Sequence, residues 1–276
     1  MGAYRRPTAL ADALAALGER PYTVLAGGTD FYPARVGRAI DEDVLDLTGI
    51  DGLKQIEERE ADWRIGAGVT WTELIEHELP PLFAGLKLAA REVGGAQIQN
   101  AGTLDGNLCN ASPAADGVPA LMALDAQVEL QGRDGLIELP LDRFILGPRK
   151  TARRPDQLVT AILVPKPAHE MRSTFLKLGA RKYLVISIAM VAATVALTER
   201  RIVDARVAIG ACSPVARRLA ALETKLRGQP LMQGIGDLAS AADLAPIAPI
   251  DDIRGTAAYR HDAALTLVRR ALEALA

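Results

Sequence analysis

The uncharged run from Tyr183 to Thr198 is the feature that most restricts how this chain can fold. The run reads YLVISIAMVAATVALT and lies between Lys182 and Glu199. A helix that crosses a bilayer needs about 18 to 20 apolar residues, and this run is shorter than that. We therefore interpret it as a buried strand of a globular protein, and we predict no membrane span.

Two more apolar runs near this strand predict a sheet in the second half of the chain. They are STFLKL at residues 173–178 and IVDARVAIGAC at residues 202–212, with the charged turn TERR at residues 198–201 before the second. Helices are predicted after the strands. The last helix carries apolar residues at the spacing of one amphipathic face, namely Leu265, Val268, Leu272 and Leu275.

The first half of the chain predicts short helices and strands in alternation. A helix over residues 10–17 is expected to end at Gly18, and Thr70 and Glu73 stand at capping-box spacing at the start of another helix. TVLAGGTD, residues 23–30, is expected to be a strand that runs into a paired-glycine turn, and a further strand is expected at residues 44–47. Two hairpins are expected, one around residues 53–66 and one whose strands 126–130 and 136–141 are joined by the turn QGRDG, together with a helix at residues 82–93. The prolines of VPKPAHE then break this pattern, so we expect an α+β protein with domains at residues 1–166 and 167–276.

Charge and cysteine content argue against several classes of protein. Lys and Arg total 32 against 34 Asp and Glu, and a net charge of -2 gives no field to attract nucleic acid or an anionic membrane. Two cysteines are too few for a disulfide framework, a four-cysteine zinc site or an iron-sulfur cluster, and this usage fits the cytoplasm. The three histidines are isolated, so we expect no metal site, and the N-terminal residues predict no targeting segment.

Two familiar catalytic or nucleotide-binding motifs receive little support. Gly66 and Gly68 follow a predicted strand as in a dinucleotide fingerprint, but Trp71 occupies the position of the third glycine. An ordinary strand-to-helix turn explains these glycines better. No Gly-x-Ser-x-Gly sequence occurs, so a hydrolase is unsupported.

Two segments of small residues are better candidates for a binding site. In LAGGTD, Gly27 and Gly28 lack the Cβ that would hold a phosphate away from the backbone, and Thr29 adds a hydroxyl. The stretch NAGTLDGNLCNASPAAD, residues 100–116, repeats this composition with Gly102, Gly106 and the polar residues Thr103, Asn107, Asn110 and Ser112. Two such segments could enclose one diphosphate from both sides.

Neither segment contains Lys or Arg, and oriented backbone amides can replace such charges around a phosphate. The carboxylates of Asp30, Asp105 and Asp116 would repel a diphosphate, so at least one of them should turn away or cap the backbone. A plain surface turn is the alternative for residues 100–116. Irregular connections longer than about 12 to 15 residues tend to be functional, which favours binding. The residues alone indicate a phosphate-containing ligand.

Four motifs in order give the chain a recognisable pattern. They are TVLAGGTDFYP at residues 23–33, GGAQIQNAGTLDGNLCNASPAADGVPALMALDAQVEL at residues 94–130, FLKLGARK at residues 175–182 and DIRGTAAYR at residues 252–260. Over essentially its whole length the chain resembles the FAD-binding medium subunit of molybdenum hydroxylases, the xanthine dehydrogenase and carbon monoxide dehydrogenase family. The resemblance implies an N-terminal FAD domain of the p-cresol methylhydroxylase and vanillyl-alcohol oxidase type. A C-terminal α+β domain with an antiparallel sheet would follow it.

The resemblance also implies which residues contact FAD. One side of the diphosphate would be wrapped by Val24, Leu25, Ala26, Gly27, Gly28, Thr29, Asp30 and Phe31. The other side would be closed by Thr103, Leu104, Asp105, Gly106 and Asn107, with Asp116 reaching in from the next segment. Lys177 matches a lysine that stabilises the reduced flavin, and Val93 and Val159 or Thr160 match wall positions.

Two positions depart from the family pattern. Asp105 stands where the family usually has the first glycine of a Gly-Gly-Asn sequence, and Val185 stands where an aspartate is more common. Asp105 therefore places a side chain where close backbone approach is expected. Val185 either alters the outer edge of the flavin site or marks a subgroup.

By resemblance, the chain is the electron-transfer subunit of a larger oxidoreductase. A large molybdopterin subunit would oxidise the substrate, and a small subunit with two-iron two-sulfur clusters would pass the electrons to FAD in this chain. NAD, oxygen or another acceptor would receive them, and the assembly would be a dimer of heterotrimers. No residue of this chain need act on the organic substrate. The alternatives are a free-standing FAD-dependent oxidase and a structural subunit that has lost FAD.

Overall fold

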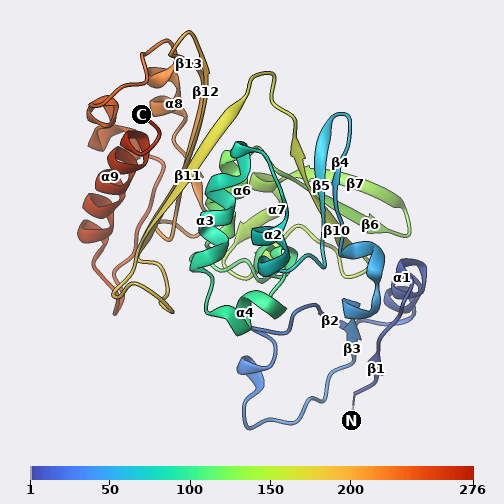
Figure 1. Ribbon diagram of the computed structural model, residues 1–276. Coiled ribbons are helices and arrows are strands. Elements are labelled where there is room, and N and C mark those ends of the chain that lie inside the picture. The colour runs from blue at the N-terminus through green and yellow to red at the C-terminus, as the bar shows by residue number, and fades with distance from the viewer. Residues whose placement is uncertain (1) are drawn as a thin grey trace.

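The computed structural model describes residues 2–276, and Figure 1 shows these residues as two packed parts. Strands β11 (Met171–Leu178), β12 (Ala189–Thr198), β13 (Arg201–Gly210) and β14 (Arg217–Arg218) form a four-stranded antiparallel sheet in the C-terminal part. Helices α8 (Ala220–Leu226) and α9 (Ala257–Glu273) follow it. None of the helices in residues 2–276 is both long and apolar enough to cross a bilayer.

The uncharged run supplies β12, which confirms the predicted buried strand from Ala189 onward. Side chains alternate across a strand, and this strand buries both of its faces. Met190 and Ala192 join the core beneath α3 (Ala84–Glu92) and α6 (Gly117–Ala123). Val191 and Ala193 join a second core that includes residues of α9. The C-terminal sheet therefore closes the core of the N-terminal part with one face and supports its own helices with the other.

The N-terminal part holds two larger sheets. Strands β1 (Tyr4–Arg5), β3 (Val44–Asp46) and β2 (Thr23–Leu25) run parallel in that order. The antiparallel sheet has the order β4 (Ile56–Glu58), β5 (Asp62–Gly66), β10 (Leu158–Pro165), β6 (Gln127–Gly132) and β7 (Gly135–Pro140). The predicted hairpins appear as the pairs β4–β5 and β6–β7. A short pair, β8 (Ile145–Gly147) and β9 (Lys150–Thr151), follows the short helix α7 (Leu141–Phe144).

Two local predictions are wrong. Helix α1 (Leu10–Glu19) continues through Gly18, and the extended Arg20 ends it, so Gly18 is not a left-handed cap. The stretch at residues 100–116 is not one irregular loop, because α4 (Ala96–Ala101) ends within it and α5 (Leu104–Asn110) occupies its centre. Thr103 caps α5 by accepting a hydrogen bond from the Gly106 amide at 3.0 Å. Leu104 and Leu108, one helical turn apart, are fully buried and hold α5 against the core.

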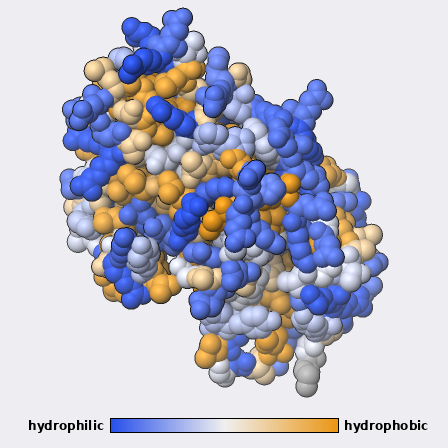
Figure 2. Space-filling model, in the orientation of Figure 1, coloured by the Kyte–Doolittle hydropathy of each residue, from blue (hydrophilic) through white to orange (hydrophobic). Residues whose placement is uncertain are grey.

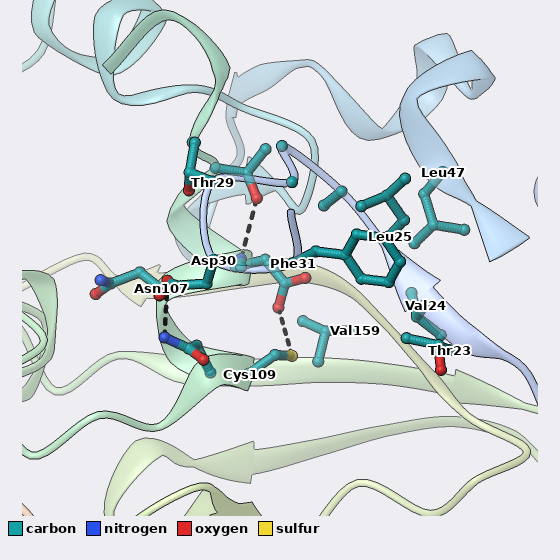
Figure 3. Close-up of a pocket in the computed structure, with 18 of the residues that line it drawn as sticks. Thr23, Val24, Leu25, Thr29, Asp30, Phe31, Leu47, Asn107, Cys109 and Val159 are labelled. Carbon is teal, nitrogen blue, oxygen red and sulfur yellow. Dashed lines mark hydrogen bonds between the residues drawn. The ribbon is translucent and has the colours of Figure 1, made fainter. Parts of the chain in front are cut away.

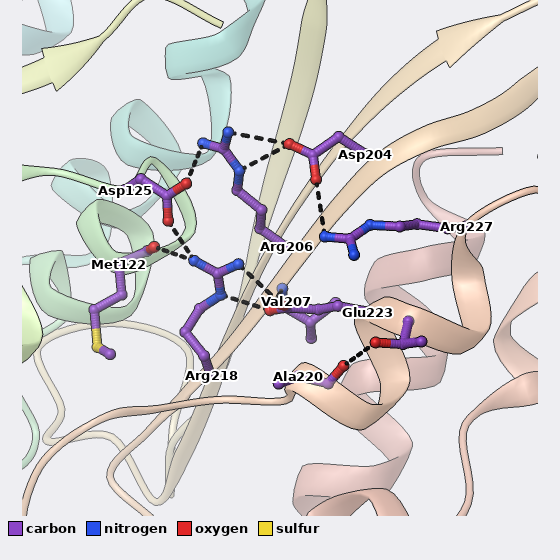
Figure 4. A network of polar contacts seen from close by, with 10 residues as sticks. Met122, Asp125, Asp204, Arg206, Val207, Arg218, Ala220, Glu223 and Arg227 are labelled. Atoms are coloured by element: carbon purple, nitrogen blue, oxygen red, sulfur yellow. Dashed lines mark hydrogen bonds and ion pairs between the residues drawn. The ribbon is translucent and has the colours of Figure 1, made fainter.

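An ion-pair network joins the two parts beside the sheet (Figure 4). Arg218 donates to the Met122 carbonyl of α6 at 3.1 Å and to Asp125, just beyond that helix, at 2.6 Å. The same guanidinium contacts both carboxylate oxygens of buried Glu223 in α8, at 2.5 and 2.9 Å. Arg206 in β13 contacts the second oxygen of Asp125 at 3.1 Å. Because planar guanidinium groups fix direction as well as distance, this network orients the C-terminal sheet against α6.

The predicted capping box begins helix α2 (Trp71–Glu76). Thr70 accepts a hydrogen bond from the Glu73 amide at 3.2 Å, and the Glu73 carboxylate accepts one from the Thr70 amide at 2.8 Å. Replacing Thr70 with valine is expected to lower the free energy of unfolding by about 1 kcal/mol, because one helix donor loses its acceptor. Urea denaturation checks this, with Thr8→Val at an exposed position as the control. Equal midpoints for the two variants would contradict the role of the cap.

Candidate functional site

A cavity of about 990 Å³ lies between the segment after β2 and helix α5. Figure 3 shows Thr29, Asp30 and Phe31 of the first segment and Asn107 and Cys109 of α5 gathered around this space. The structure thus brings together the two segments that the sequence singled out. Of the predicted contact residues, those that line the cavity are Val24, Leu25, Ala26, Gly27, Gly28, Thr29, Asp30, Phe31, Thr103, Asp105, Gly106, Asn107 and Val159. Val93 lines it as well.

The two glycines after β2 determine how closely the walls approach. A Cβ on Gly27 would lie 1.8 Å from the carbonyl oxygen of Ala101, at the end of α4. Real Cβ atoms do not come so close to backbone, so only glycine permits this contact. Gly28 has a φ of +71°, which L side chains adopt only with strain. The backbone of the first segment can therefore lie directly against the start of the second.

Polar side chains of both segments line the cavity. The Asn107 Oδ1 atom is buried and has no hydrogen-bond partner among residues 2–276. This oxygen faces away from the cavity, because a Cβ on Gly117, which does not line the cavity, would lie 3.1 Å from it. Asp30 accepts a hydrogen bond from the Asn110 amide nitrogen at 2.8 Å, and Arg149 donates to the Asn110 side-chain oxygen. Asp30 is therefore one carboxylate that already has a protein donor.

Arginines that the sequence reasoning missed also line the cavity. They are Arg35, Arg149 and Arg153, and none of them belongs to the two segments of small residues. Arg35 stacks over the Phe31 ring at 3.7 Å from its centre. Arg149 and Arg153 flank β9, about 40 residues beyond α5, and only the folded chain brings them to the cavity. The site thus combines backbone amides with positive side chains, which suits an anion.

Asp105 lies in the first turn of α5 and is only 6% exposed. Its Oδ1 atom accepts a hydrogen bond from the Cys109 thiol at 3.2 Å. Burial raises the pKa of Asp105 to about 7, although the Cys109 hydrogen bond and the charge of Arg153 both lower it. Burial also raises the pKa of Cys109, and the neighbouring Asp105 adds to that shift. The carboxyl does not separate the two walls, because they meet at Gly27 and Ala101.

Three of the predicted contact residues do not line this cavity. Leu104 is fully buried in the core. Asp116 and Lys177 form an ion pair of 2.7 Å, and both side chains are less than 10% exposed. Ser187 donates to the other oxygen of Asp116 at 2.6 Å. Burial raises the pKa of Asp116, against the opposing effects of Lys177 and Ser187.

The ion pair nevertheless lies close behind one wall. Lys177 donates to the Glu92 carbonyl at 3.2 Å, one residue before Val93, which lines the cavity. Thr160 is also turned away, because its hydroxyl donates to the Glu129 carboxylate at 2.6 Å. Asp116 and Lys177 therefore support the wall from behind in this structure.

Comparison with known proteins identifies the kind of ligand. Residues 1–167 match the family described as the FAD binding domain in molybdopterin dehydrogenase, and residues 174–275 match the CO dehydrogenase flavoprotein C-terminal domain. The chain belongs to this family. It is 35% identical over 280 residues to the carbon monoxide dehydrogenase medium chain of Afipia carboxidovorans, covering 98% of this chain and 95% of that one.

Other members of the molybdopterin dehydrogenase family agree over the same length. The nicotine 6-hydroxylase medium subunit of Paenarthrobacter nicotinovorans is 29% identical and covers 98% of this chain, which spans 95% of that subunit. The crystal structure of the cyanide-inactivated Cu,Mo-CO dehydrogenase has a chain with a TM-score of 0.90 and 30% identity. That match covers 99% of this chain and 96% of the other. These relatives confirm the two-part fold predicted from the four motifs.

The cavity fits the cofactor of a molybdopterin dehydrogenase flavin domain. Its volume is at the upper end of the range of about 300 to 1,000 Å³ seen for ligand pockets, as a dinucleotide requires. Gly27 lets the two cavity walls meet without a clash, and Gly28 gives the first wall a left-handed turn. Arginines on the rim supply positive charge for a diphosphate. The donor set is thus suited to FAD.

Proposed function

We propose that this chain binds FAD in the cavity between the segment after β2 and helix α5 and serves as the electron-transfer subunit of a molybdenum hydroxylase. The chain's membership in the family of FAD-binding medium subunits supports this proposal. The observation that carries it is the contact at Gly27, where the two cavity walls meet at a distance that excludes any side chain. We also propose residues 1–166 as the FAD domain and residues 167–276 as the C-terminal domain.

Each part of the site has a separate task in this proposal. Backbone amides of residues 26–30 hold the diphosphate, and Arg149 and Arg153 offset its charge. Val93 and Val159 provide apolar walls, and the Lys177–Asp116 pair fixes the wall at Val93 from behind. When bound, FAD would supply a carrier that accepts and releases electrons. The protein positions that carrier and excludes competing reactions.

The relatives' names, medium chain and medium subunit, describe components of larger assemblies. We propose that this chain likewise joins a large molybdopterin subunit and a small subunit with two-iron two-sulfur clusters, as a dimer of heterotrimers in the cytoplasm. Electrons would leave FAD for NAD or another acceptor. Figure 2 shows many apolar residues on the surface of the C-terminal part. Three large apolar side chains of this part are more than half exposed, namely Tyr183, Leu184 and Ile253. Such side chains supply surface for subunit contacts.

Purification of the chain from its native source tests this function. We expect a flavin absorption spectrum with about one FAD per chain, and co-purification with two further subunits that carry molybdenum and iron. A preparation without flavin that cannot be reconstituted with FAD would support a structural subunit and overturn the proposal. A chain that purifies alone and oxidises a substrate would instead show a free-standing oxidase.

A further inference from the structure

Asp105 gives the wall of this cavity a buried carboxyl group. The residue lines the FAD cavity, and its neighbours along α5, Gly106 and Asn107, line the same wall. Its Oδ1 atom is occupied by the Cys109 thiol at 3.2 Å, so Oδ2 is the atom left to carry a proton or meet a ligand. Asp105 forms no ion pair within residues 2–276. A group in this position affects ligand binding through its charge.

The elements packed around α5 offer little to stabilise that charge. Helix α5 contacts α6, β9 and β10, and α6 and β10 contain no ionisable side chain. Strand β9 has Lys150, which is exposed. The remaining ionisable neighbours are Cys109, whose raised pKa keeps it a neutral thiol, and Arg153, which is held by the Gln157 carbonyl at 2.8 Å. The charged groups across the cavity are bonded to other residues. Asp30 and Arg149 are hydrogen-bonded to the Asn110 side chain, and Arg35 forms an ion pair with Glu42.

We propose that Asp105 is protonated when FAD is bound and that its Oδ2 hydroxyl donates a hydrogen bond to an oxygen of the cofactor. This inference rests on the proposed FAD site. A charged carboxylate would repel the diphosphate, whereas a neutral carboxylic acid is a donor of short, strong hydrogen bonds to anionic oxygen. FAD binding then takes up a proton whenever Asp105 is ionised in the unliganded chain.

The direction in which pH changes FAD affinity follows from two effects on the pKa of Asp105. Burial raises the pKa of Asp105 to about 7 before any ligand binds. A nearby diphosphate adds negative charge, which raises the pKa of the carboxyl further. Asp105 thus has one pKa in the free chain and a higher pKa in the FAD complex. At pH values between these two, Asp105 is ionised in the free chain and protonated in the complex. The dissociation constant for FAD should therefore increase up to about tenfold per pH unit above pH 7, by proton linkage.

The test titrates FAD into the flavin-free full chain from pH 6 to pH 9 and follows quenching of flavin fluorescence. The wild-type dissociation constant should rise with pH above about 7, and that of Asp105→Asn should stay nearly constant. The asparagine variant also controls for ionisation of the flavin itself. Cys109→Ala is the matched control, because it removes the other titratable group of this wall and should retain the pH dependence.

Calorimetry of the wild-type chain provides a readout that needs no variant. Binding heats measured at pH 8 in two buffers of different ionisation enthalpy give the number of protons taken up, and we expect between about half a proton and one. A pH-independent dissociation constant with no proton uptake would overturn the role of Asp105 and leave the FAD site intact. Failure of the wild type, Asp105→Asn and Asp105→Gly to bind FAD at every pH would overturn the proposed function itself.

Discussion

Replacing Gly27 with alanine is expected to weaken FAD binding at least 100-fold, which corresponds to about 2.8 kcal/mol. The new Cβ would lie 1.8 Å from the Ala101 carbonyl oxygen, and neither atom can move without moving the backbone. The segment after β2 must therefore withdraw from the end of α4. The two walls of the cavity then lose the spacing at which they can enclose one diphosphate. Fluorescence titration of the flavin-free chain with FAD measures the loss.

Gly52→Ala is the matched control for this variant. Gly52 has no heavy atom within 4 Å of its would-be Cβ, so the same change should leave FAD affinity and stability close to wild type. Circular dichroism of Gly27→Ala checks that the chain remains folded. If Gly27→Ala binds FAD with the wild-type dissociation constant, the close contact between the walls does not form the site.

Replacing Lys177 with methionine is expected to lower the free energy of unfolding by about 3 to 5 kcal/mol. The Asp116 carboxylate would stay buried with Ser187 as its remaining side-chain donor. Burial already raises the pKa of Asp116 above its ordinary value, and loss of Lys177 should raise it further. A raised pKa in the folded state contributes stability that is lost as pH increases through that pKa. The destabilisation should therefore be larger at pH 8 than at pH 5, as measured by urea denaturation.

Two further variants decide what Lys177 does. Lys177→Met with Asp116→Asn should recover most of the lost stability, because the buried charge is gone and Ser187 keeps an acceptor. Lys166→Met is the matched control, since Lys166 pairs with the largely exposed Glu58 and should cost less than about 1 kcal/mol. A Lys177→Met protein of unchanged stability but altered flavin reduction potential would contradict the supporting role and favour direct contact with the flavin.

The sequence predicted those features that depend on local patterns. Strand β12, the hairpin β6–β7 and the capping box at Thr70 follow from periodicity and from side chains within a few residues of one another. The two segments of small residues were also correctly paired, because their composition suits the same kind of ligand. Family resemblance, rather than composition, supplied FAD as that ligand.

The errors lie where distant contacts or competing signals decide the structure. Gly18 resembled a helix end, yet the chain remains helical to Glu19. The glycines of residues 100–116 suggested a loop, whereas the cap at Thr103 and the burial of Leu108 favour α5. Arg149 and Arg153 gave no local signal, because their role depends on where β9 lies relative to α5 in the folded chain.

The two buried faces of β12 affect how the protein can be made. During synthesis, the apolar sides of α3 and α6 leave the ribosome before the strand that will cover them. Residues 171–210 must emerge and pair before either core is complete. These long-range pairings slow folding and leave apolar surface open meanwhile. The nascent chain is therefore most exposed to aggregation, and most in need of a chaperone, while β11 to β13 are being translated.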